Sequence, residues 1–323
     1  MAAIIALVFT IIFFPFSSPV SALRSNYYDK TCPHLEQIVN STVEKAMKND
    51  RTVAAGLLRM HFHDCFIRGC DASVLLESKK GNHKAEKDGI PNISLHAFYV
   101  IDHAKEKLEA LCPGVVSCAD ILALAARDAV FLSGGPTWKV PKGRKDGIIS
   151  KADDTILSPY PLPRPTSNIY ELRGNFSGRG LSLKDLVALS GGHTLGFSHC
   201  SSFQDRIHNF NDTLDIDPSL NPSFANSLRS VCPMHNKNRS AGSVLDSTPF
   251  KFDNMYYKLL LQGKSIFTSD QALLTDKTTR ALVVKYATCQ EEFEKAFVKS
   301  MIRMSKIRGH GRQEIRLNCS VVR

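Results

Sequence analysis

The sequence lacks the short motifs that mark several common enzyme and metal-binding classes. Neither H-E-x-x-H nor G-x-S-x-G occurs, which removes the most frequent signatures of secreted hydrolases. C-x-x-C and C-x-x-C-H are absent too, which argues against zinc knuckles and against covalently attached haem. The chain also has no internal repeat, no low-complexity run and few segments of alternating polarity. These absences favour a mostly helical globule with long loops.

Long hydrophobic runs are missing except at the N-terminus. Residues 2–14 are almost wholly apolar, and Val20-Ser21-Ala22 supplies the small residues of a cleavage site. The run is too short for a typical membrane span, and no other stretch could cross a bilayer. Although Lys and Arg are absent before the run, the pattern predicts a secretory signal at 1–22 and a mature domain at 23–323.

Positive charge is in excess, but it is not concentrated. The chain has 41 Lys and Arg against 31 Asp and Glu, a formal net charge of +10, and residues 1–22 carry none of it. Because the basic residues form no block and are not interleaved with aromatic residues, nucleic-acid binding is disfavoured. Adhesion to an acidic extracellular polysaccharide is a hypothesis that fits this charge.

The nine cysteines must be interpreted together with the predicted export. In an oxidising compartment eight of them could form four disulfides, with one thiol left over, and the spacing alone leaves the pairing open. The sequence also contains the acceptor pattern for N-linked glycans, so it predicts a glycoprotein. The acceptor positions are Asn40, Asn92, Asn175, Asn211, Asn238 and Asn318.

Helical patterns dominate the remaining sequence. The segment 116–132 is nearly all apolar, which predicts a buried central helix. Ser182 and Asp185 form a capping-box-like start to a short helix that the glycines at 191–192 should end. The segment 134–164 is rich in Gly and Pro and predicts a loop. We expect helices at 34–48, 52–65, 95–111, 116–132, 182–190, 224–231, 254–261, 278–287 and 291–304.

One stretch, 57–73, concentrates side chains that carry chemistry. Arg59 and His63 are four residues apart, so they share a helix face, and a fixed cation beside a titratable base suits polarising a small oxygen compound. Asp64 points away from that face, towards a loop that also contains Asp71 and Ser73. Hard oxygen ligands at this spacing suit calcium, although the pattern is not that of an EF-hand.

A second candidate site follows about 130 residues later. His193 lies just beyond a predicted helix end, beside two glycines that would let a flat ligand approach the backbone. A histidine in that position could hold a haem iron. Taken alone, it would more often be a structural histidine.

Two other classes compete with a haem protein. A secreted metallohydrolase could use His61, His63 and Asp64, but His61 and His63 are about 200° apart on a helix, which is poor geometry for one ion. A catalytically dead wall-binding glycoprotein is the other alternative. The presence of Arg59, His63 and His193 together argues against it.

With both segments in view, the chain resembles the secretory plant peroxidases (class III) over essentially its whole mature length. The motifs that carry the resemblance are YYDKTCP at 27–33, RMHFHDCF at 59–66, GCDASVLL at 69–76, VSCADILALAARDAV at 116–130, GGPTWKVPKGRKD at 134–146, DLVALSGGHTLG at 185–196, FDNMYY at 252–257, SDQ at 269–271 and IRLNC at 315–319.

The resemblance implies an all-α fold with little β structure, in which distal and proximal helical halves enclose one non-covalent haem b. His193 matches the axial iron ligand, and Asp270 matches the carboxylate that accepts its other ring proton. His63, Arg59 and Asn92 match the catalytic set. In that set the histidine is the acid–base, the arginine is its cationic partner, and the asparagine accepts the proton on Nδ1 of the histidine.

Further roles follow from the same resemblance. Phe62 matches the aromatic residue that crowds the peroxide pocket, Pro163 the proline of the donor site, and Glu86 the residue that anchors the asparagine. Two calcium ions are implied, and the proximal loop is shortened to Asp246-Ser247-Thr248. The distal ligands would be Asp64, Ile67, Gly69, Asp71 and Ser73, and the proximal ligands Thr194, Asp246, Thr248, Lys251 and Asp253.

The resemblance also implies the state of each cysteine, the activity and the location of the protein. Cys289 is left unpaired, and Asp120 and Arg144 match a buried structural ion pair. The expected activity is peroxide-driven, one-electron oxidation of phenolic donors such as lignin precursors and wall phenolics, with peroxide removal under oxidative stress. The enzyme would be a monomer in the cell wall, the apoplast or the vacuole. The implied disulfides are Cys32–Cys112, Cys65–Cys70, Cys118–Cys319 and Cys200–Cys232.

Overall fold

A computed structural model describes residues 22–78, 81, 84–159 and 161–323. The predicted signal, residues 1–22, therefore lies outside the described residues except for Ala22. The α-helices are α1 (Leu35–Asn49), α2 (Val53–Ile67), α3 (Phe98–Leu111), α4 (Cys118–Leu132), α5 (Asp154–Leu157), α6 (Ile169–Ser177), α7 (Leu183–Ser190), α8 (Gln204–Ile207), α9 (Pro222–Val231), α10 (Met255–Leu261), α11 (Thr268–Ala272), α12 (Lys277–Thr288) and α13 (Gln290–Met304).

Strands are few and short in the described part of the chain. Two antiparallel pairs form, β1 with β4 and β2 with β3, and the prediction of a mainly helical fold with long loops and little β structure is confirmed. None of the described helices is long and apolar enough to cross a membrane. The strands are β1 (Asp146–Gly147), β2 (Phe197–His199), β3 (Gly242–Val244) and β4 (Gln313–Glu314), and the 3₁₀ turns are η1 (Ser73–Leu75), η2 (Glu86–Asp88), η3 (Gly191–Thr194) and η4 (Cys200–Ser202).

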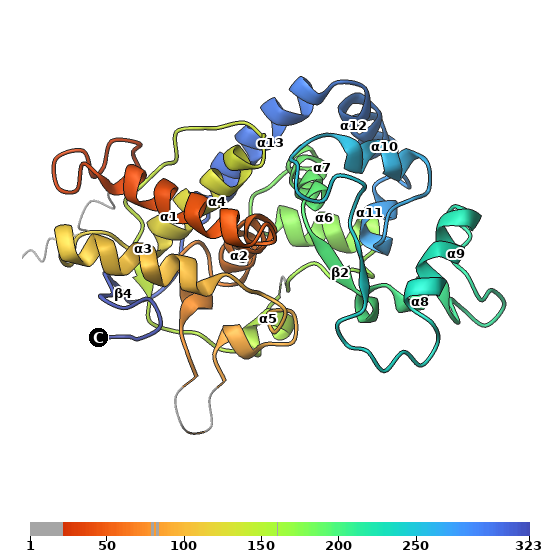
Figure 1. Cartoon of the computed structure of the whole chain (residues 1–323), viewed down its shortest axis with the longest axis horizontal. Helices are drawn as coiled ribbons and strands as arrows, with labels where there is room; N and C mark the ends of the chain where they lie inside the picture. The colour runs from red at the N-terminus through yellow and green to blue at the C-terminus, as the bar shows by residue number, and fades with distance from the viewer. Residues whose placement is uncertain (1–21, 79–80, 82–83, 160) are drawn as a thin grey trace, which may run out of the picture.

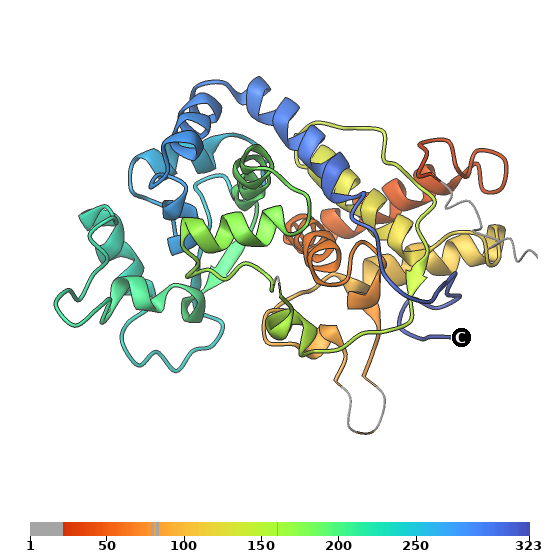
Figure 2. The same ribbon diagram turned by 180° about the vertical axis from the view of Figure 1, so that it is seen from behind.

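The helices form two groups, seen from opposite sides in Figures 1 and 2. Helices α1 to α4 lie at one end, and α6 to α12 lie at the other. Helix α13 runs between the groups and packs against α7. The chain then returns to the first group, where β4 pairs with β1. This arrangement places α2, which carries Arg59 and His63, beside η3, which carries His193.

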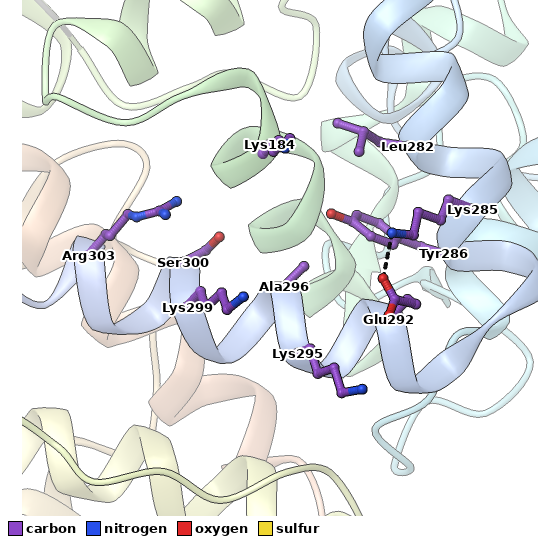
Figure 3. Close-up of a pocket in the computed structure, with 10 residues that line it drawn as sticks. All are labelled: Lys184, Leu282, Lys285, Tyr286, Glu292, Lys295, Ala296, Lys299, Ser300 and Arg303. Carbon is purple, nitrogen blue, oxygen red and sulfur yellow. Dashed lines mark ion pairs between the residues drawn. The ribbon is translucent and has the colours of Figure 1, made fainter.

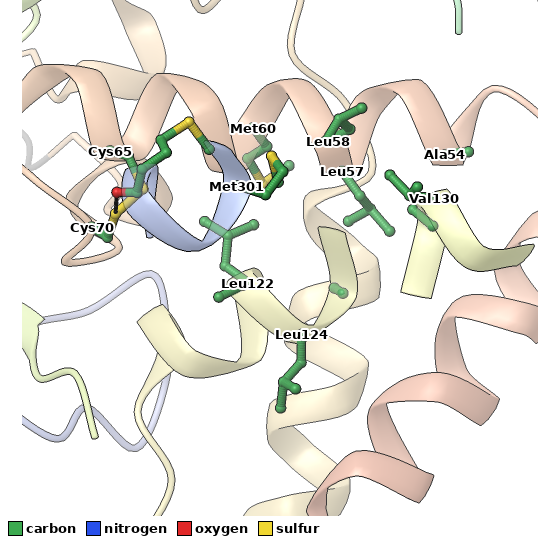
Figure 4. Packing of buried hydrophobic residues seen from close by; sticks show 14 of the residues in the cluster. Ala54, Leu57, Leu58, Met60, Cys65, Cys70, Leu122, Leu124, Val130 and Met301 are labelled. Carbon is green, nitrogen blue, oxygen red and sulfur yellow. Dashed lines mark hydrogen bonds between the residues drawn. A yellow bond between two sulfur atoms is a disulfide. The ribbon is translucent and has the colours of Figure 1, made fainter. Parts of the chain in front are cut away.

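The core is centred on the packing of α2 against α4. Thirteen of the fifteen residues of α4 are buried, as the nearly all-apolar segment 116–132 predicts. Figure 4 shows side chains of three helices meeting there, including Leu57 of α2, Leu122 of α4 and Met301 of α13. Because α2 is buried on most of its surface, its active face is held rigidly.

Four disulfides fasten the chain, and they are the same four pairs that the resemblance implies. Cys118–Cys319 ties the C-terminal segment to α4, and Cys65–Cys70 closes the loop after α2. Cys32–Cys112 joins the start of α1 to the end of α3, while Cys200–Cys232 holds the small cluster under α8 and α9. Cys289 is a free, half-buried thiol.

Two local predictions were incomplete. The segment 134–164 is not wholly loop, since it contains β1 and α5. Helix α6 was missed, although Asn168 and Glu171 form a reciprocal capping box at its start, a signal that the sequence shows.

Helix α7 ends at Ser190 with Gly191 as its C-cap, as predicted, and the chain continues into the 3₁₀ turn η3. Gly191 has a φ of −62°, so it does not need the conformational freedom of glycine. It needs the absence of a side chain, because a Cβ there would overlap Phe293 and the hydroxyl of Tyr257.

Candidate active site

Arg59 projects from α2 with its guanidinium held at both ends. Its Nη1 donates to Oγ of Ser94 at 2.9 Å, and its Nη2 donates to the backbone oxygen of Pro91 at 2.8 Å. Desolvation by the surrounding protein atoms lowers its pKa to about 10, so the group stays cationic at neutral pH. The residue as a whole is nevertheless exposed.

His63 is buried on the same helix and is fixed by Asn92. Its Nδ1 lies 2.6 Å from Oδ1 of Asn92, and Nδ2 of Asn92 donates to the backbone oxygen of Glu86 at 2.7 Å. Since the amide oxygen can only accept, Nδ1 carries the proton and Nε2 keeps its lone pair. Burial, and then the charge of Arg59, lowers the pKa of His63 well below its usual value. The arrangement is therefore a neutral base.

Glu86 holds Asn92, as the resemblance implies. It anchors Asn92 through its backbone oxygen, while its carboxylate accepts a hydrogen bond from Oγ of Ser73 at 3.2 Å. The carboxylate faces the loop after α2, and burial together with the charges of Asp71 and Asp64 raises its pKa well above the usual value. Glu86 thus connects the His63 acceptor to the acidic loop.

The two predicted substrate-pocket residues lie on different segments. Phe62 is half-buried on α2, where its ring lies 5.6 Å from that of His63 and 4.3 Å from that of Phe66. Pro163 is half-buried in the loop before α6. That loop is tied to α11 where the amide of Ser269 donates to the oxygen of Pro165. No described contact joins Phe62 to Pro163.

His193 lies in η3 and faces outward more than His63 does. Its side chain is 40% exposed, and its Nδ1 donates to Oδ1 of the buried Asp270 at 2.8 Å. Within the described residues, Nε2 of His193 has no hydrogen-bond partner. A histidine whose Nδ1 is held by a carboxylate and whose Nε2 is open matches the donor that a haem iron takes, so His193 fits that group.

Sequence analysis did not predict two contacts at this site. Tyr256 of α10 donates its hydroxyl to the same Oδ1 of Asp270 at 2.8 Å. Ser94 is one of the two acceptors that hold Arg59. Both residues lie close to predicted site residues, Tyr256 in the FDNMYY motif and Ser94 two residues after Asn92. Their roles depend on tertiary contacts and leave no periodic signal.

The loop after α2 gathers buried oxygen atoms. Asp64 is fully buried, and neither of its carboxylate oxygens has a hydrogen-bond partner among the described residues. Burial and the neighbouring charge of Asp71 raise the pKa of Asp64 well above its usual value, and burial raises that of Asp71 to about 6. Ser73 is also buried, and Gly69 turns the chain with a φ of 90°. Orphaned carboxylate oxygens beside a second carboxylate fit a bound calcium ion.

The loop between β3 and α10 carries four of the five residues proposed for the second cation, and it lies against the fifth, Thr194 of η3. Oγ1 of Thr194 donates to Oδ2 of Asp246 at 2.6 Å, and Oγ1 of Thr248 donates to Oδ1 of Asp253 at 3.1 Å. The backbone oxygen of Lys251 lies 3.5 Å from Oγ1 of Thr194. Despite the shortened loop, Asp246 therefore lies with the other four. The donor set is again oxygen-rich, which fits calcium.

The described residues contain no cluster that supports the zinc-hydrolase alternative. Among the described residues, the one group of His, Cys, Asp and Glu close enough to hold an ion is His61, Asp64 and Cys65, which excludes His63. Cys65 is bonded to Cys70, so it has no thiolate to offer. His61 is 1% exposed, and burial lowers its pKa to about 3. It is a packed core residue.

Most of the chain is similar to known proteins. A family model described as peroxidase matches residues 39–289. The chain is 65% identical over 313 residues to Peroxidase 64 of Arabidopsis thaliana, covering 97% of each chain. It is 53% identical over 303 residues to Peroxidase 66 of the same plant, covering 94% of this chain and 92% of the relative. Peroxidase 3 is 45% identical over 312 residues, covering 95% of this chain and 94% of the relative.

Proposed function

Because the chain belongs to the class III plant peroxidases and is a peroxidase enzyme, we propose that it works with one non-covalent haem b bound by His193 and oxidises small phenolic donors. The observation that carries this proposal is the contrast in hydrogen bonding at two histidines with open Nε2 atoms. His63 is held by a neutral amide, and His193 is held by a carboxylate. The first suits a base and the second a metal ligand.

A bound haem would supply the redox-active iron on which peroxide is reduced. The chain's own residues handle protons and charge. Nε2 of His63 accepts a proton from one peroxide oxygen and returns it to the other, which leaves as water. The guanidinium of Arg59 stabilises the negative charge that develops as the O–O bond breaks. Asn92 keeps Nδ1 protonated, so that Nε2 is available at the start of each cycle.

The test is the absorption spectrum of purified wild type, His193→Ala and His199→Ala proteins. We expect wild type and the His199 control to show a Soret band that shifts when peroxide is added. His193→Ala should lose the Soret band, or it should show an altered iron coordination that returns to the wild-type form when imidazole is added. The metallohydrolase and inactive glycoprotein alternatives predict no such band. An unchanged spectrum in His193→Ala would refute the assigned ligand.

Two calcium ions complete the proposed cofactor set. Asp64, Asp71 and Ser73 would hold the distal ion with the backbone oxygens of Ile67 and Gly69. The proximal ion would be held by Thr194, Asp246, Thr248, the backbone oxygen of Lys251, and Asp253. The support is the buried, oxygen-rich character of both loops. Metal analysis of the purified protein should find two calcium ions for each chain.

The proposed setting is outside the cell, in the wall or apoplast, or in the vacuole, with the protein acting as a monomer on wall phenolics or lignin precursors and removing peroxide. If the protein is exported, accessible acceptor asparagines should carry glycans. Asn211 and Asn238 are exposed, whereas Asn92 is 1% and Asn175 is 9% exposed. Glycopeptide mass spectrometry should find glycans at the first pair. A glycan on Asn92 would contradict its proposed role beside His63.

The proposed acidic polysaccharide partner has a candidate docking surface, the basic groove between α12, α13 and the start of α7 (Figure 3). Its volume is about 300 Å³. Residues Lys295, Lys299 and Arg303 follow one another at every fourth position of α13, so they form a row with a step of about 6 Å. Lys184 lies on α7 and Lys285 on α12. A row of cations suits a linear polyanion better than a single small anion.

Not all of this charge is neutralised within the protein. Arg303 pairs with the buried Asp185, Lys285 pairs with Glu292, and Lys295 pairs with Glu291. In the described part of the chain, Lys184 and Lys299 have no ion-pair partner. The hydrogen bond from Lys285, and then the charges of Lys285, Lys295 and Lys299, lower the pKa of the Glu292 carboxyl.

The groove is tested by two charge-reversal pairs with the same change in net charge. Lys184→Glu with Lys299→Glu should weaken salt-sensitive binding to immobilised polygalacturonate more than Lys30→Glu with Lys45→Glu, at unchanged peroxidase activity. Equal weakening would mean that only net charge matters and would reject the groove. Equally tight binding of nucleic acid would make the surface a general polyanion site.

A further inference from the structure

Asp270 accepts two hydrogen bonds on one oxygen atom. Nδ1 of His193 and the hydroxyl of Tyr256 both lie 2.8 Å from Oδ1. Asp270 and Tyr256 are each only 3% exposed, so solvent does not replace either bond. The rings of Tyr256 and His193 also meet edge to face, with centroids 6.0 Å apart. The three side chains come from η3, α10 and α11, so tertiary packing fixes their geometry.

Two donors on one oxygen compete for the same negative charge. A hydroxyl bonded to a carboxylate takes up part of its charge and weakens its pull on the other donor. Because an ionised carboxylate can only accept, the hydroxyl of Tyr256 is the donor in this bond. Tyr256 therefore competes with His193 for the negative charge on Oδ1 of Asp270.

We propose that Tyr256 is a positioning residue that limits how strongly Asp270 draws the Nδ1 proton of His193, and thereby limits electron donation from Nε2 to the haem iron. The inference rests on the proposed role of His193 as iron ligand. A carboxylate that pulls harder on Nδ1–H gives the imidazole more anionic character, which stabilises the oxidised metal. Without the tyrosine hydroxyl, ferric iron should be favoured more strongly.

The neighbouring residue provides a matched control. Tyr257 is buried beside Tyr256, and its hydroxyl donates to the backbone oxygen of Val187 at 2.8 Å. Tyr257→Phe therefore deletes a buried hydroxyl from the same helix and leaves both bonds to Asp270 in place. Any effect that reflects general loosening of α10 should occur in both variants, whereas an effect on Asp270 should occur only in Tyr256→Phe.

The experiment measures the ferric/ferrous midpoint potential of each holoenzyme and the iron–histidine stretching frequency of its ferrous form. Tyr256→Phe should shift the potential to a more negative value and raise the stretching frequency. A tenfold shift in the one-electron equilibrium corresponds to about 59 mV, and we expect a shift of up to that size. Tyr257→Phe should leave both quantities unchanged. An unshifted Tyr256→Phe, or equal shifts in the two variants, would overturn the inference.

A second variant covers the possibility that Tyr256→Phe fails to fold. Fluorotyrosine incorporated at position 256 keeps the ring and the hydroxyl but is a stronger donor, so it should shift the potential to a more positive value. A shift in the other direction, or none, counts against the inference. The proposed function fails separately, and the inference with it, if wild type binds no haem or if His193→Ala keeps native coordination.

Discussion

The two active-site histidines carry the same side chain and differ in the group that holds Nδ1. His63 is 6% exposed and bonds to the neutral oxygen of Asn92, while the side chain of His193 is 40% exposed and bonds to the carboxylate of Asp270. An amide accepts the proton without adding charge, so Nε2 of His63 is a moderate base. A carboxylate pushes charge into the ring, so Nε2 of His193 is a strong ligand.

Under the proposed roles, the atom that accepts the Nδ1 proton sets the task of each imidazole. Position on the backbone contributes less, because both rings leave Nε2 open. The comparison also predicts which changes matter: loss of a ring should have the largest effect, exchange of the partners should have a smaller one, and changes in the supporting loops should have the smallest.

Removing the His63 ring tests the strongest part of the comparison. His63→Leu keeps the bulk of the residue but deletes the base, and general acid–base catalysis is worth about 10²–10⁴-fold. We expect the second-order rate constant for peroxide, measured by stopped-flow absorbance, to fall by at least about 10²-fold. The Soret band should remain, since His193 is intact. A rate constant close to that of wild type would show that His63 is not the base.

Exchanging the partners tests whether the acceptor sets the task. In Asp270→Asn the proximal acceptor becomes neutral, like the distal one, and we expect about a 10–100-fold loss of haem retention or turnover, as is typical for partners of metal ligands. In Asn92→Asp the distal acceptor becomes charged, which should favour the protonated form of His63 and raise the pH at which the peroxide reaction becomes fast. Pyridine haemochrome titration and pH–rate profiles measure the two effects. If both variants behave like wild type, the acceptor of Nδ1 does not set the role of either histidine.

The two proposed cation-binding loops, like the two histidines, differ in the hydrogen-bond partners of a key side chain. Asp64, in the last turn of α2 and facing the first loop, has no hydrogen-bond partner at either carboxylate oxygen among the described residues, whereas Asp246 in the other loop accepts bonds from Thr194 and Thr248. If the proposed calcium ion binds there, the first loop depends on it for neutralisation. The second is partly satisfied by the protein itself.

This contrast predicts that Asp64→Asn has opposite effects on stability in excess calcium and in excess chelator. In excess calcium Asp64→Asn should lower the free energy of unfolding, because a ligand is lost. In excess chelator it should raise the free energy of unfolding by about 1–3 kcal/mol, because an unpaired buried charge is removed. Asp246→Asn should be destabilising under both conditions. Denaturant unfolding of the two variants measures this, and a stable Asp246→Asn protein in chelator would remove the distinction between the loops.

Much of the fold followed from simple patterns, because α2 and α4 are long, apolar and uninterrupted. The active face was also predictable, since Arg59 and His63 lie four residues apart on one helix. The partner residues were not predictable from periodicity. Asn92 and Asp270 are distant in sequence from the histidines that they hold, and only the resemblance to the family pointed to them.

Three details escaped both periodicity and resemblance. The hydroxyl of Tyr256 in α10 reaches Asp270 in α11, and it is the backbone oxygen of Glu86 that holds Asn92. Gly191 is explained by the close approach of Phe293 rather than by a sharp turn. Each depends on which atoms meet in three dimensions, and a one-dimensional pattern does not contain that information.

The smallest predicted effect compares the backbone supports of the two histidines. A Cβ on Gly56, in the distal helix α2, would lie 2.9 Å from Nε2 of His96, an exposed side chain that can rotate away. Gly56→Ala should therefore be nearly neutral or stabilise by up to about 1 kcal/mol through helix propensity. A Cβ on Gly191, beside His193, meets buried Phe293 and Tyr257. Gly191→Ala should cost about 1–3 kcal/mol by overpacking.

Denaturant unfolding of the two alanine variants gives both free energies under the same conditions. The helix that carries His63 should tolerate added volume because its neighbour is at the surface. The turn that carries His193 should not, because two buried rings fix its position. Equal losses in the two variants would show that the distal support is packed as tightly as the proximal one, and His96 would then have to be held more firmly than its exposure and its bond to the oxygen of Thr52 indicate.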